Sequence, residues 1–175
     1  GILKTCRYLS GYMRYMFSQK ELICTIEEEI THLREYILLQ EVRYPDSLEC
    51  GLELEPQILH CRIPTLSLHS LVENIFKYGI QNQEKLDIQV KGSLLIEENK
   101  VMLIVSDNGP GFDDAVIQAV NEGNFTEERH KIGLNNTVLR FRELYQDRFH
   151  IFIENNNGAK VELCFPYETE EEAAR

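Results

Sequence analysis

The sequence predicts an α/β fold, in which helices cover one face of a mixed sheet and a helical arm precedes that sheet. The spacing of apolar residues changes from helical to alternating after Pro45. Strand-like and helix-like segments then follow one another through residues 48–166, with turn-forming residues between them. No repeat with a period of roughly 20 to 50 residues divides the chain. These three observations together predict one layered domain.

The arm is predicted as two helices. Residues 2–16 place apolar side chains at the a and d steps of about two heptads. Thr25 and Glu28 form the pattern of a capping box, and the acidic run 27–29 suits a helix N-terminus. We expect this second helix to run to about Tyr44 and to stop before Pro45. Its apolar stripe comprises Ile26, Ile30, Leu33 and Ile37.

Residues 48–54 alternate between apolar and polar as a half-buried strand does, and Pro56 closes this strand. Pro64 suits the first turn of a third helix, which we expect to end at Gly79. Two strands follow at 86–97 and 100–107, joined by a polar turn.

After a glycine-rich loop and a polar linker, we expect a helix at 133–145. Two final strands are predicted at 150–155 and 159–166. The acidic tail 168–175 is expected to fray.

Composition excludes several classes of function. The chain has 175 residues, of which 43% are apolar and 27% charged, as in an ordinary globular protein. Its longest apolar run, 101–105, is far shorter than the roughly 20 residues that cross a bilayer, and the first residues do not combine a charged segment with a following apolar stretch. A net charge of −11 repels phosphate backbones, so we expect no nucleic-acid partner.

The five cysteines are odd in number and include no CxxC pair, so they suggest neither a disulfide framework nor a zinc site. They fit a reducing compartment. Gly1 stands where an initiator Met is usual, and we therefore expect a fragment cut from a longer protein.

The predicted helix 64–79 carries a polar face formed by Glu73, Asn74 and Lys77. A solvated face with a Glu73–Lys77 ion pair explains this pattern. However, Asn is a poor residue in the middle of a helix. Because Mg²⁺ takes one or two protein oxygens plus substrate phosphates, Asn74 would also suit a metal ligand and Lys77 a phosphate contact.

The loop 107–112 leaves the end of an apolar strand, where ligand sites gather in layered folds. Gly109 and Gly111 permit positive φ and a close approach of the backbone to a flat ring. Asp107 would accept a hydrogen bond from the exocyclic amine of adenine, whereas guanine presents a second acceptor there. A tight turn explains the same residues, since Asp-Asn-Gly is favourable turn chemistry.

The stretch 121–131 is polar and lacks a clear period, and Gly133, Leu134 and Asn135 then open a helix. A mobile linker that ends at a helix N-terminus offers free N–H groups to an anion. A surface loop followed by a capped helix is the alternative.

Taken in order, these motifs resemble the four nucleotide-binding boxes of the ATP-binding domain shared by histidine kinases, gyrase and MutL. The boxes are Glu73-Asn74 with Lys77 and Gly79, then residues 107–111, then 133–136, and Asn157-Gly158. The stretch LSLHSLVENIFKYG at 66–79 resembles the LLLQPLVENAIKHG of LytS/YesM-like sensor histidine kinases. Upstream, YLSGYMRYMF, IEEEITHLREYILLQEVRY and RIPTLSL are similar to segments of the same subfamily.

The resemblance implies a Bergerat-type α/β sandwich that binds Mg·ATP. It divides the chain into partial dimerisation or linker helices at 1–44, a catalytic domain at 45–167 and the acidic tail at 168–175. Asn74 would hold Mg²⁺, and Asp107 would bind the adenine amine. The implied catalytic residues are Glu73, Asn74 and Lys77. The implied nucleotide-binding residues are Asn74, Lys77, Tyr78, Asp107, Gly109, Gly111, Lys131, Gly133, Leu134 and Asn135. Residues 112–132 would form a short lid.

The function implied is transfer of the γ-phosphoryl group of ATP to a histidine outside this fragment, because the Asn-Pro-His-Phe acceptor motif of the subfamily is absent. The implied partners are ATP or ADP, the phosphoacceptor domain of the same protein, a response regulator, and a second copy bound through the arm. The implied location is a cytoplasmic domain of a protein in the cell membrane.

This sequence departs from the family pattern at three places. Lys131 replaces the first glycine of the lid motif, Tyr78 replaces a histidine, and His69-Ser70 replace Gln-Pro. Two alternatives stay open, namely a serine kinase of the anti-sigma-factor type and a degenerate module that serves nucleotide binding or protein contacts.

Overall fold

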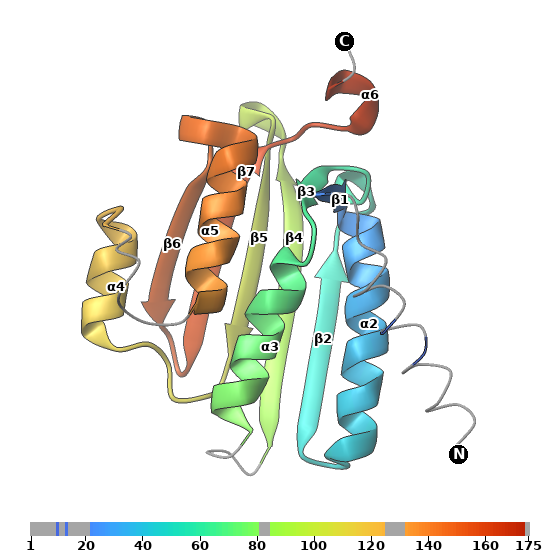
Figure 1. Ribbon diagram of the computed structural model, residues 1–175, viewed down its shortest axis with the longest axis vertical. Helices are drawn as coiled ribbons and strands as arrows, with labels where there is room; N and C mark the ends of the chain where they lie inside the picture. Colours follow the sequence, from blue (N-terminus) through green and yellow to red (C-terminus); the bar gives the residue numbers. More distant parts are fainter. Residues whose placement is uncertain (1–9, 11–12, 14–21, 81–84, 125–131, 174–175) are drawn as a thin grey trace.

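The computed structural model describes residues 10, 13, 22–80, 85–124 and 132–173 of the chain. The heptad pattern predicted for residues 2–16 lies outside the described residues except at positions 10 and 13. The main feature is a five-stranded sheet in the order β2-β4-β5-β7-β6. Figure 1 shows α3 and α5 on one face of this sheet, with α2 next to β2 and α4 next to β6.

The sheet is mixed, as predicted. β2 and β4 are parallel, and the other neighbouring pairs are antiparallel. Alternate side chains on its helix-covered face are buried, and they form one hydrophobic core with the helices. The strands are β2 (Leu48–Leu54), β4 (Leu86–Leu95), β5 (Lys100–Asp107), β6 (His150–Asn155) and β7 (Ala159–Pro166). A separate two-stranded sheet pairs β1 (Ile23–Thr25) with β3 (Arg62–Pro64).

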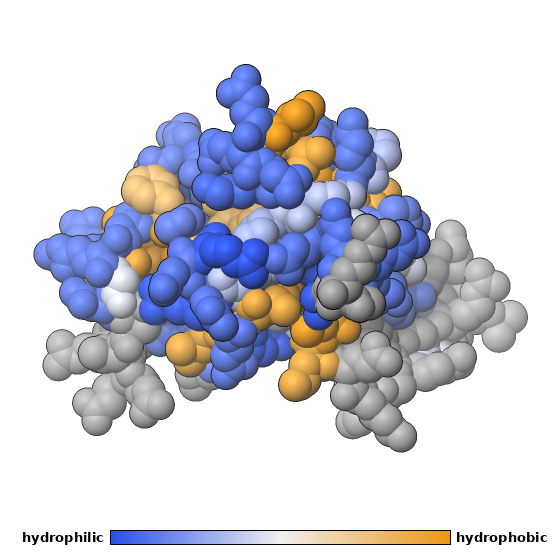
Figure 2. Space-filling model, turned by 90° about the horizontal axis from the view of Figure 1, so that it is seen from above, coloured by the Kyte–Doolittle hydropathy of each residue, from blue (hydrophilic) through white to orange (hydrophobic). Residues whose placement is uncertain are grey.

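The helices are α2 (Ile26–Arg43), α3 (Ser67–Gly79), α4 (Asp114–Asn121), α5 (Ile132–Tyr145) and α6 (Glu170–Ala173). Short 3₁₀ turns are η1 (Pro56–Ile58), η2 (Ile96–Glu98) and η3 (Gln146–Arg148). In the described parts of the chain, no helix combines the length and the apolar character needed to cross a membrane. Figure 2, which views the molecule from the end that carries α6, shows mainly hydrophilic residues with small hydrophobic spots between them.

The predicted start and end of α2 are confirmed. The Thr25 hydroxyl oxygen accepts a hydrogen bond from the Glu28 N–H at 3.2 Å, and the Glu28 carboxylate accepts one from the Thr25 N–H at 2.9 Å. This capping box satisfies two N–H groups at the helix start. The helix ends at Arg43, with Tyr44 as its C-cap.

The prediction that Pro64 opens the third helix is wrong. Pro64 is the last residue of β3, where it pairs with Ile23, and α3 begins only at Ser67. The Thr65 N–H donates to the Leu22 carbonyl at 3.1 Å, which extends this pairing by one residue. Pairing with a distant strand therefore overrides the local preference of proline for a first helical turn.

The structure differs from the prediction in the first half of the presumed lid and at the end of the strand predicted at 86–97. Residues 114–121 form α4, whose Val116 and Val120 are buried, so this half of the predicted lid belongs to the packed fold. The predicted strand 86–97 ends at Leu95, where η2 makes the turn into β5.

The tail is less frayed than expected. The Glu168 carbonyl accepts from the Arg62 N–H at 2.9 Å, and Thr169 forms an isolated β-bridge with Cys61. These contacts hold the start of the tail against β3, and α6 follows directly.

Candidate functional site

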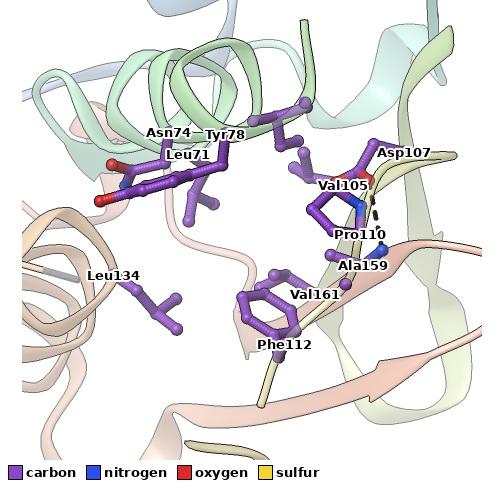
Figure 3. Close-up of a pocket in the computed structure, with 13 residues that line it drawn as sticks. Leu71, Asn74, Tyr78, Val105, Asp107, Pro110, Phe112, Leu134, Ala159 and Val161 are labelled. Atoms are coloured by element: carbon purple, nitrogen blue, oxygen red, sulfur yellow. Dashed lines mark hydrogen bonds between the residues drawn. The ribbon is translucent and has the colours of Figure 1, made fainter. Parts of the chain in front are cut away.

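A partly open pocket lies between α3, the start of α5 and the loop that follows β5. In Figure 3, Asn74, Leu71 and Tyr78 come from α3, while Asp107 and Pro110 lie across the pocket from them. Its apolar walls are Leu71, Ile75, Val105, Pro110, Phe112, Leu134, Ala159 and Val161. Asn74, Tyr78 and Asp107 supply its polar side chains, and Gly79 and Gly111 complete the lining. An apolar slot with a few polar groups is the usual form of a small-molecule site.

Asp107 stands at the end of β5 and is half-buried. Its Oδ1 accepts a hydrogen bond from the Gly109 N–H at 2.6 Å. It also accepts one from the Ala159 N–H at 3.3 Å (Figure 3). These two backbone donors fix the orientation of the carboxylate at one end of the pocket.

The neighbouring Asn108 anchors the loop to the preceding strand. Its Oδ1 accepts from the Asp87 N–H at 2.9 Å, and its Nδ2 donates to the Lys85 carbonyl at 3.0 Å. The start of the loop after β5 is therefore attached to the start of β4.

Two glycines are required by the close approach of neighbouring groups. A Cβ at Gly109 would lie 2.8 Å from the Asp107 Oδ1, so any side chain there would disturb the carboxylate. Gly111 has a φ of 77°, and a Cβ there would lie 2.5 Å from the Asn155 Oδ1. Positive φ is a conformation that glycine adopts readily and other residues do not.

Asn155, which the sequence did not single out, explains this crowding. Its side-chain amide exchanges two hydrogen bonds with the Phe112 backbone, accepting from the N–H at 2.8 Å and donating to the carbonyl at 2.8 Å. The Asn155 side chain thus makes the same pair of hydrogen bonds that a neighbouring strand would make. These bonds hold Phe112, whose ring forms one wall of the pocket. No sequence pattern marks this contact, because the two residues are 43 positions apart.

The structure confirms the predicted polar face of α3, but only some of its residues line the pocket. Asn74 and Tyr78 line the pocket, whereas Glu73 and Lys77 are exposed and do not. The Lys77 Nζ lies 5.5 Å from the centre of the Tyr78 ring, which places its charge at the pocket rim. The roles predicted for Glu73 and Lys77 stay predictions.

The predicted lid residues are only partly described. Leu134 is buried and lines the pocket, and Asn135 is half-buried but does not line it. Gly133 lies in the first turn of α5, while Lys131 lies outside the described residues. The position of Leu134 shows that the pocket reaches the start of α5.

Buried metal-binding clusters and reactive thiols are not seen in the described residues. No group of three or more His, Cys, Asp or Glu side chains there could hold a metal ion. Burial raises the pKa of the Cys24 and Cys50 thiols to about 12, so both stay protonated at neutral pH. The four described cysteines are free; Cys24 and Cys61 are buried, and Cys50 and Cys164 are half-buried.

Two family profiles match this chain, each over a different range of residues. The profile of the family described as "Histidine kinase-, DNA gyrase B-, and HSP90-like ATPase" matches residues 65–169. A second profile, described as "Histidine kinase", matches residues 2–48. Both matches confirm the resemblance predicted from the motifs.

Two curated relatives are similar over most of the chain. The sensor histidine kinase YesM of Bacillus subtilis (strain 168) is 29% identical over 176 residues, covering 97% of this chain and 28% of the relative. The sensor protein kinase HptS of Staphylococcus aureus (strain USA300) is 27% identical over 157 residues, covering 87% and 30%. The chain therefore spans less than a third of the length of these relatives.

Solved structures show the same fold. The catalytic domain of histidine kinase ThkA in a nucleotide-free form aligns with a TM-score of 0.58 at 18% identity, covering 85% of this chain and 97% of that domain. Full-length ShkA in complex with AMPPNP aligns with a TM-score of 0.57 at 17% identity, covering 96% of this chain and 36% of that one.

Proposed function

Because this chain belongs to the histidine kinase-, DNA gyrase B- and HSP90-like ATPase family, we propose that it is the ATP-binding catalytic part of a sensor histidine kinase. It binds Mg·ATP in the pocket between α3 and the loop after β5. The γ-phosphoryl group is then transferred to a histidine outside this chain, on the phosphoacceptor domain of the same protein.

The observation that carries the proposal is the position of Asp107. Its carboxylate is fixed by the Gly109 and Ala159 N–H groups at one end of an otherwise mostly apolar slot. A flat purine fits such a slot, and its exocyclic amine donates to the carboxylate. The ring would then pack against apolar side chains from both sides of the pocket, including Leu71 and Phe112.

The residues at the other side of the pocket fit the metal and the phosphates. Mg²⁺ bound to a nucleotide needs only one or two protein oxygens, so it does not require the acidic cluster that the described residues lack. The Asn74 side chain offers one such oxygen on the pocket lining. Lys77 at the rim would place a positive charge near the phosphates, and Glu73 would lie beside them on the exposed face of α3.

Phosphoryl transfer requires mainly positioning and neutralisation of charge. In this proposal, Mg²⁺ supplies charge neutralisation at the phosphates, while Asp107 and the apolar walls orient the base. Tyr78, Gly109 and Gly111 shape the pocket, and Lys131, Gly133, Leu134 and Asn135 contribute its lid. The five histidines lack the Asn-Pro-His-Phe context of an acceptor.

The partners follow from the same assignment. The phosphoacceptor domain receives the phosphoryl group and passes it to a response regulator. The helices before Pro45 would contribute to a homodimer, and the full-length protein would lie in the cell membrane with this part on the cytoplasmic side.

Isothermal titration of the chain with ATP and ADP, with and without Mg²⁺, tests the proposal. We expect saturable binding of one nucleotide, and we expect no stable self-labelling from γ-labelled ATP. A chain that binds neither nucleotide would instead support the degenerate interaction module, and acid-labile labelling of one of its own histidines would contradict the assignment of the acceptor.

A further inference from the structure

Glu29 is a buried acid that joins two helices. Its side chain belongs to α2 and is only 1% exposed. Its Oε2 accepts a hydrogen bond from the Leu66 N–H at 2.9 Å, and its Oε1 accepts one from the His69 N–H at 3.0 Å. The Cys24 thiol also donates to Oε2, at 3.7 Å. Both carboxylate oxygens are therefore used to hold the start of α3.

The start of α3 lacks a cap of its own. Leu66 occupies the N-cap position with a φ of 63°, and no side-chain cap comes from the neighbouring sequence. Leucine has no acceptor for the free N–H groups of a first helical turn, which Ser, Thr, Asp or Asn would satisfy. The Glu29 side chain takes this role from another helix through its hydrogen bonds with the Leu66 and His69 N–H groups.

Contact between α2 and α3 continues beyond the cap. The Tyr36 ring lies edge-on to the His69 ring, with centroids 4.6 Å apart, and to the Phe76 ring at 5.9 Å. Tyr36, His69 and Phe76 are all buried. The other side of α3 presents Asn74 and Tyr78 to the pocket. A single helix thus separates α2 from the candidate nucleotide site.

The same junction is attached to α5. The Thr65 carbonyl accepts a hydrogen bond from the Arg140 guanidinium, and the Arg62 carbonyl accepts one from the Tyr145 hydroxyl at 2.6 Å. Leu134 at the start of α5 lines the pocket. The segment between β3 and α3 therefore connects α2 to both helices that border the site.

We propose that Glu29 is a positioning residue for the nucleotide site, because its carboxylate makes the position of α3 depend on that of α2. Displacement of α2 would then move Asn74 and Tyr78 relative to the loop after β5 and change nucleotide affinity. This inference rests on the proposed function, and it gives the helix that precedes the catalytic domain a route for regulating that function.

The test compares Glu29→Gln with Thr25→Ala. Glu29→Gln keeps the shape of the side chain but replaces one acceptor oxygen with a donor that faces a backbone N–H. Thr25→Ala removes the cap of α2 itself, at the first turn of the same helix, where the Thr25 hydroxyl is hydrogen-bonded to Glu28. Both variants are expected to lower the melting temperature, so stability alone does not separate them.

Two measurements separate the variants. Without nucleotide, hydrogen exchange of the amides in 66–79 should become at least about 5-fold faster in Glu29→Gln and stay near wild type in Thr25→Ala. Affinity for Mg·ATP should fall by about 5-fold or more only in Glu29→Gln, the lower range of typical coupling between sites. Equal behaviour of the two variants, or wild-type exchange and affinity in Glu29→Gln, would overturn the inference.

The design also separates this inference from the proposed function. If the wild-type chain binds no adenine nucleotide, the proposed function fails, while the exchange of residues 66–79 still decides whether Glu29 holds α3. If Glu29→Gln does not fold, hydrogen exchange of the wild-type chain with and without Mg·ATP tests the inference by itself. Coupling is reciprocal, so Mg·ATP should slow exchange in α2 as well as in α3, and protection confined to α3 would contradict the role of Glu29.

Discussion

Gly158 and Asp107 approach each other so closely that Gly158 has no room for a side chain. An ideal Cβ on Gly158 would lie 1.9 Å from the carbonyl oxygen of Asp107, and its φ of 147° also disfavours any other residue. This contact sets the turn between β6 and β7 against the end of β5. The glycine of the last box is therefore needed for the backbone that carries the carboxylate, and it need not touch a ligand itself.

We expect Gly158→Ala to lower the free energy of unfolding by about 2 to 4 kcal/mol, because both backbone strain and a backbone clash are introduced. Gly123→Ala is the matched control. Gly123 also has a positive φ, 76°, but the nearest atom to its Cβ position is the end of the Arg142 side chain at 3.7 Å. The control should lose only about 1 kcal/mol in urea denaturation, and similar losses in both variants would contradict the importance of the contact.

Local patterns predicted those parts of the fold whose cause is local. The capping box of Thr25 and Glu28, the end of α3 at Gly79 and the strands 150–155 and 159–166 were all found as expected. Pro64 was misassigned because its strand pairs with residues about 40 positions away.

Features of the site that depend on distant partners could not be predicted in the same way. The motifs indicated Asn74, Asp107 and Gly111, which line the pocket. The contacts of Glu29 with His69 and of Asn155 with Phe112 join residues that are 40 and 43 positions apart. The spacing of apolar and polar residues along the sequence does not predict such contacts. The helix α4 was overlooked because its apolar pattern is only eight residues long.

Asn155→Ala should release the wall of the pocket formed by Phe112. The variant loses two hydrogen bonds to the Phe112 backbone but removes no side chain from the pocket lining. We expect affinity for adenine nucleotides to fall by about 5- to 30-fold, as one or two hydrogen bonds of about 1 kcal/mol would give. Asn156→Ala is a control at an exposed neighbouring position. Fluorescence competition would contradict the assignment if Asn155→Ala bound as tightly as the control.

His69 should make the stability of the fold depend on pH. Burial, and to a lesser degree His32, lowers the pKa of His69 from 6.5 to about 4. Between pH 6.5 and 4, the unfolded chain therefore binds a proton at His69 that the folded protein does not bind. Because protons then favour the unfolded state, the free energy of unfolding is not reduced by His69 above pH 6.5 and decreases as the pH falls towards 4. Its size is about 1 to 3 kcal/mol.

The variant His69→Gln should flatten the change in unfolding free energy between pH 6.5 and 4 relative to the wild type. Urea denaturation of both proteins at several pH values measures this change. An unchanged slope in His69→Gln would show that His69 binds its proton as readily in the folded protein as in the unfolded chain, and would contradict the lowered pKa.

Asn74→Ala tests the proposed metal contact. The variant removes the oxygen that would bind Mg²⁺ while it leaves Asp107 and the apolar walls in place. We expect weaker binding of Mg·ATP, by about 10-fold or more for one charge-assisted contact, and little change in the binding of ADP without Mg²⁺. Isothermal titration under both conditions distinguishes this from a general loss of the pocket, in which both affinities would fall together.

The choice of base should depend on the carboxylate of Asp107. A hydrogen bond to a charged group contributes about 1.5 to 3 kcal/mol, so Asp107→Ala should lose roughly 10- to 150-fold in ATP affinity. GTP presents an acceptor where ATP presents a donor, so the wild-type chain should prefer ATP by at least a similar factor. Packing of the ring against the apolar walls treats both purines alike and cannot produce this preference.

Asp107→Asn gives the sharper result, because it keeps one oxygen for the Gly109 and Ala159 N–H groups and adds an NH₂ donor. That donor suits the guanine O6 and opposes the adenine amine, so the preference for ATP over GTP should shrink or reverse while the fold is retained. Competition of both nucleotides against a fluorescent adenine nucleotide measures the ratio directly. If Asp107→Asn keeps the full preference for ATP, then another group reads the base and the pocket does not place the adenine amine against this carboxylate.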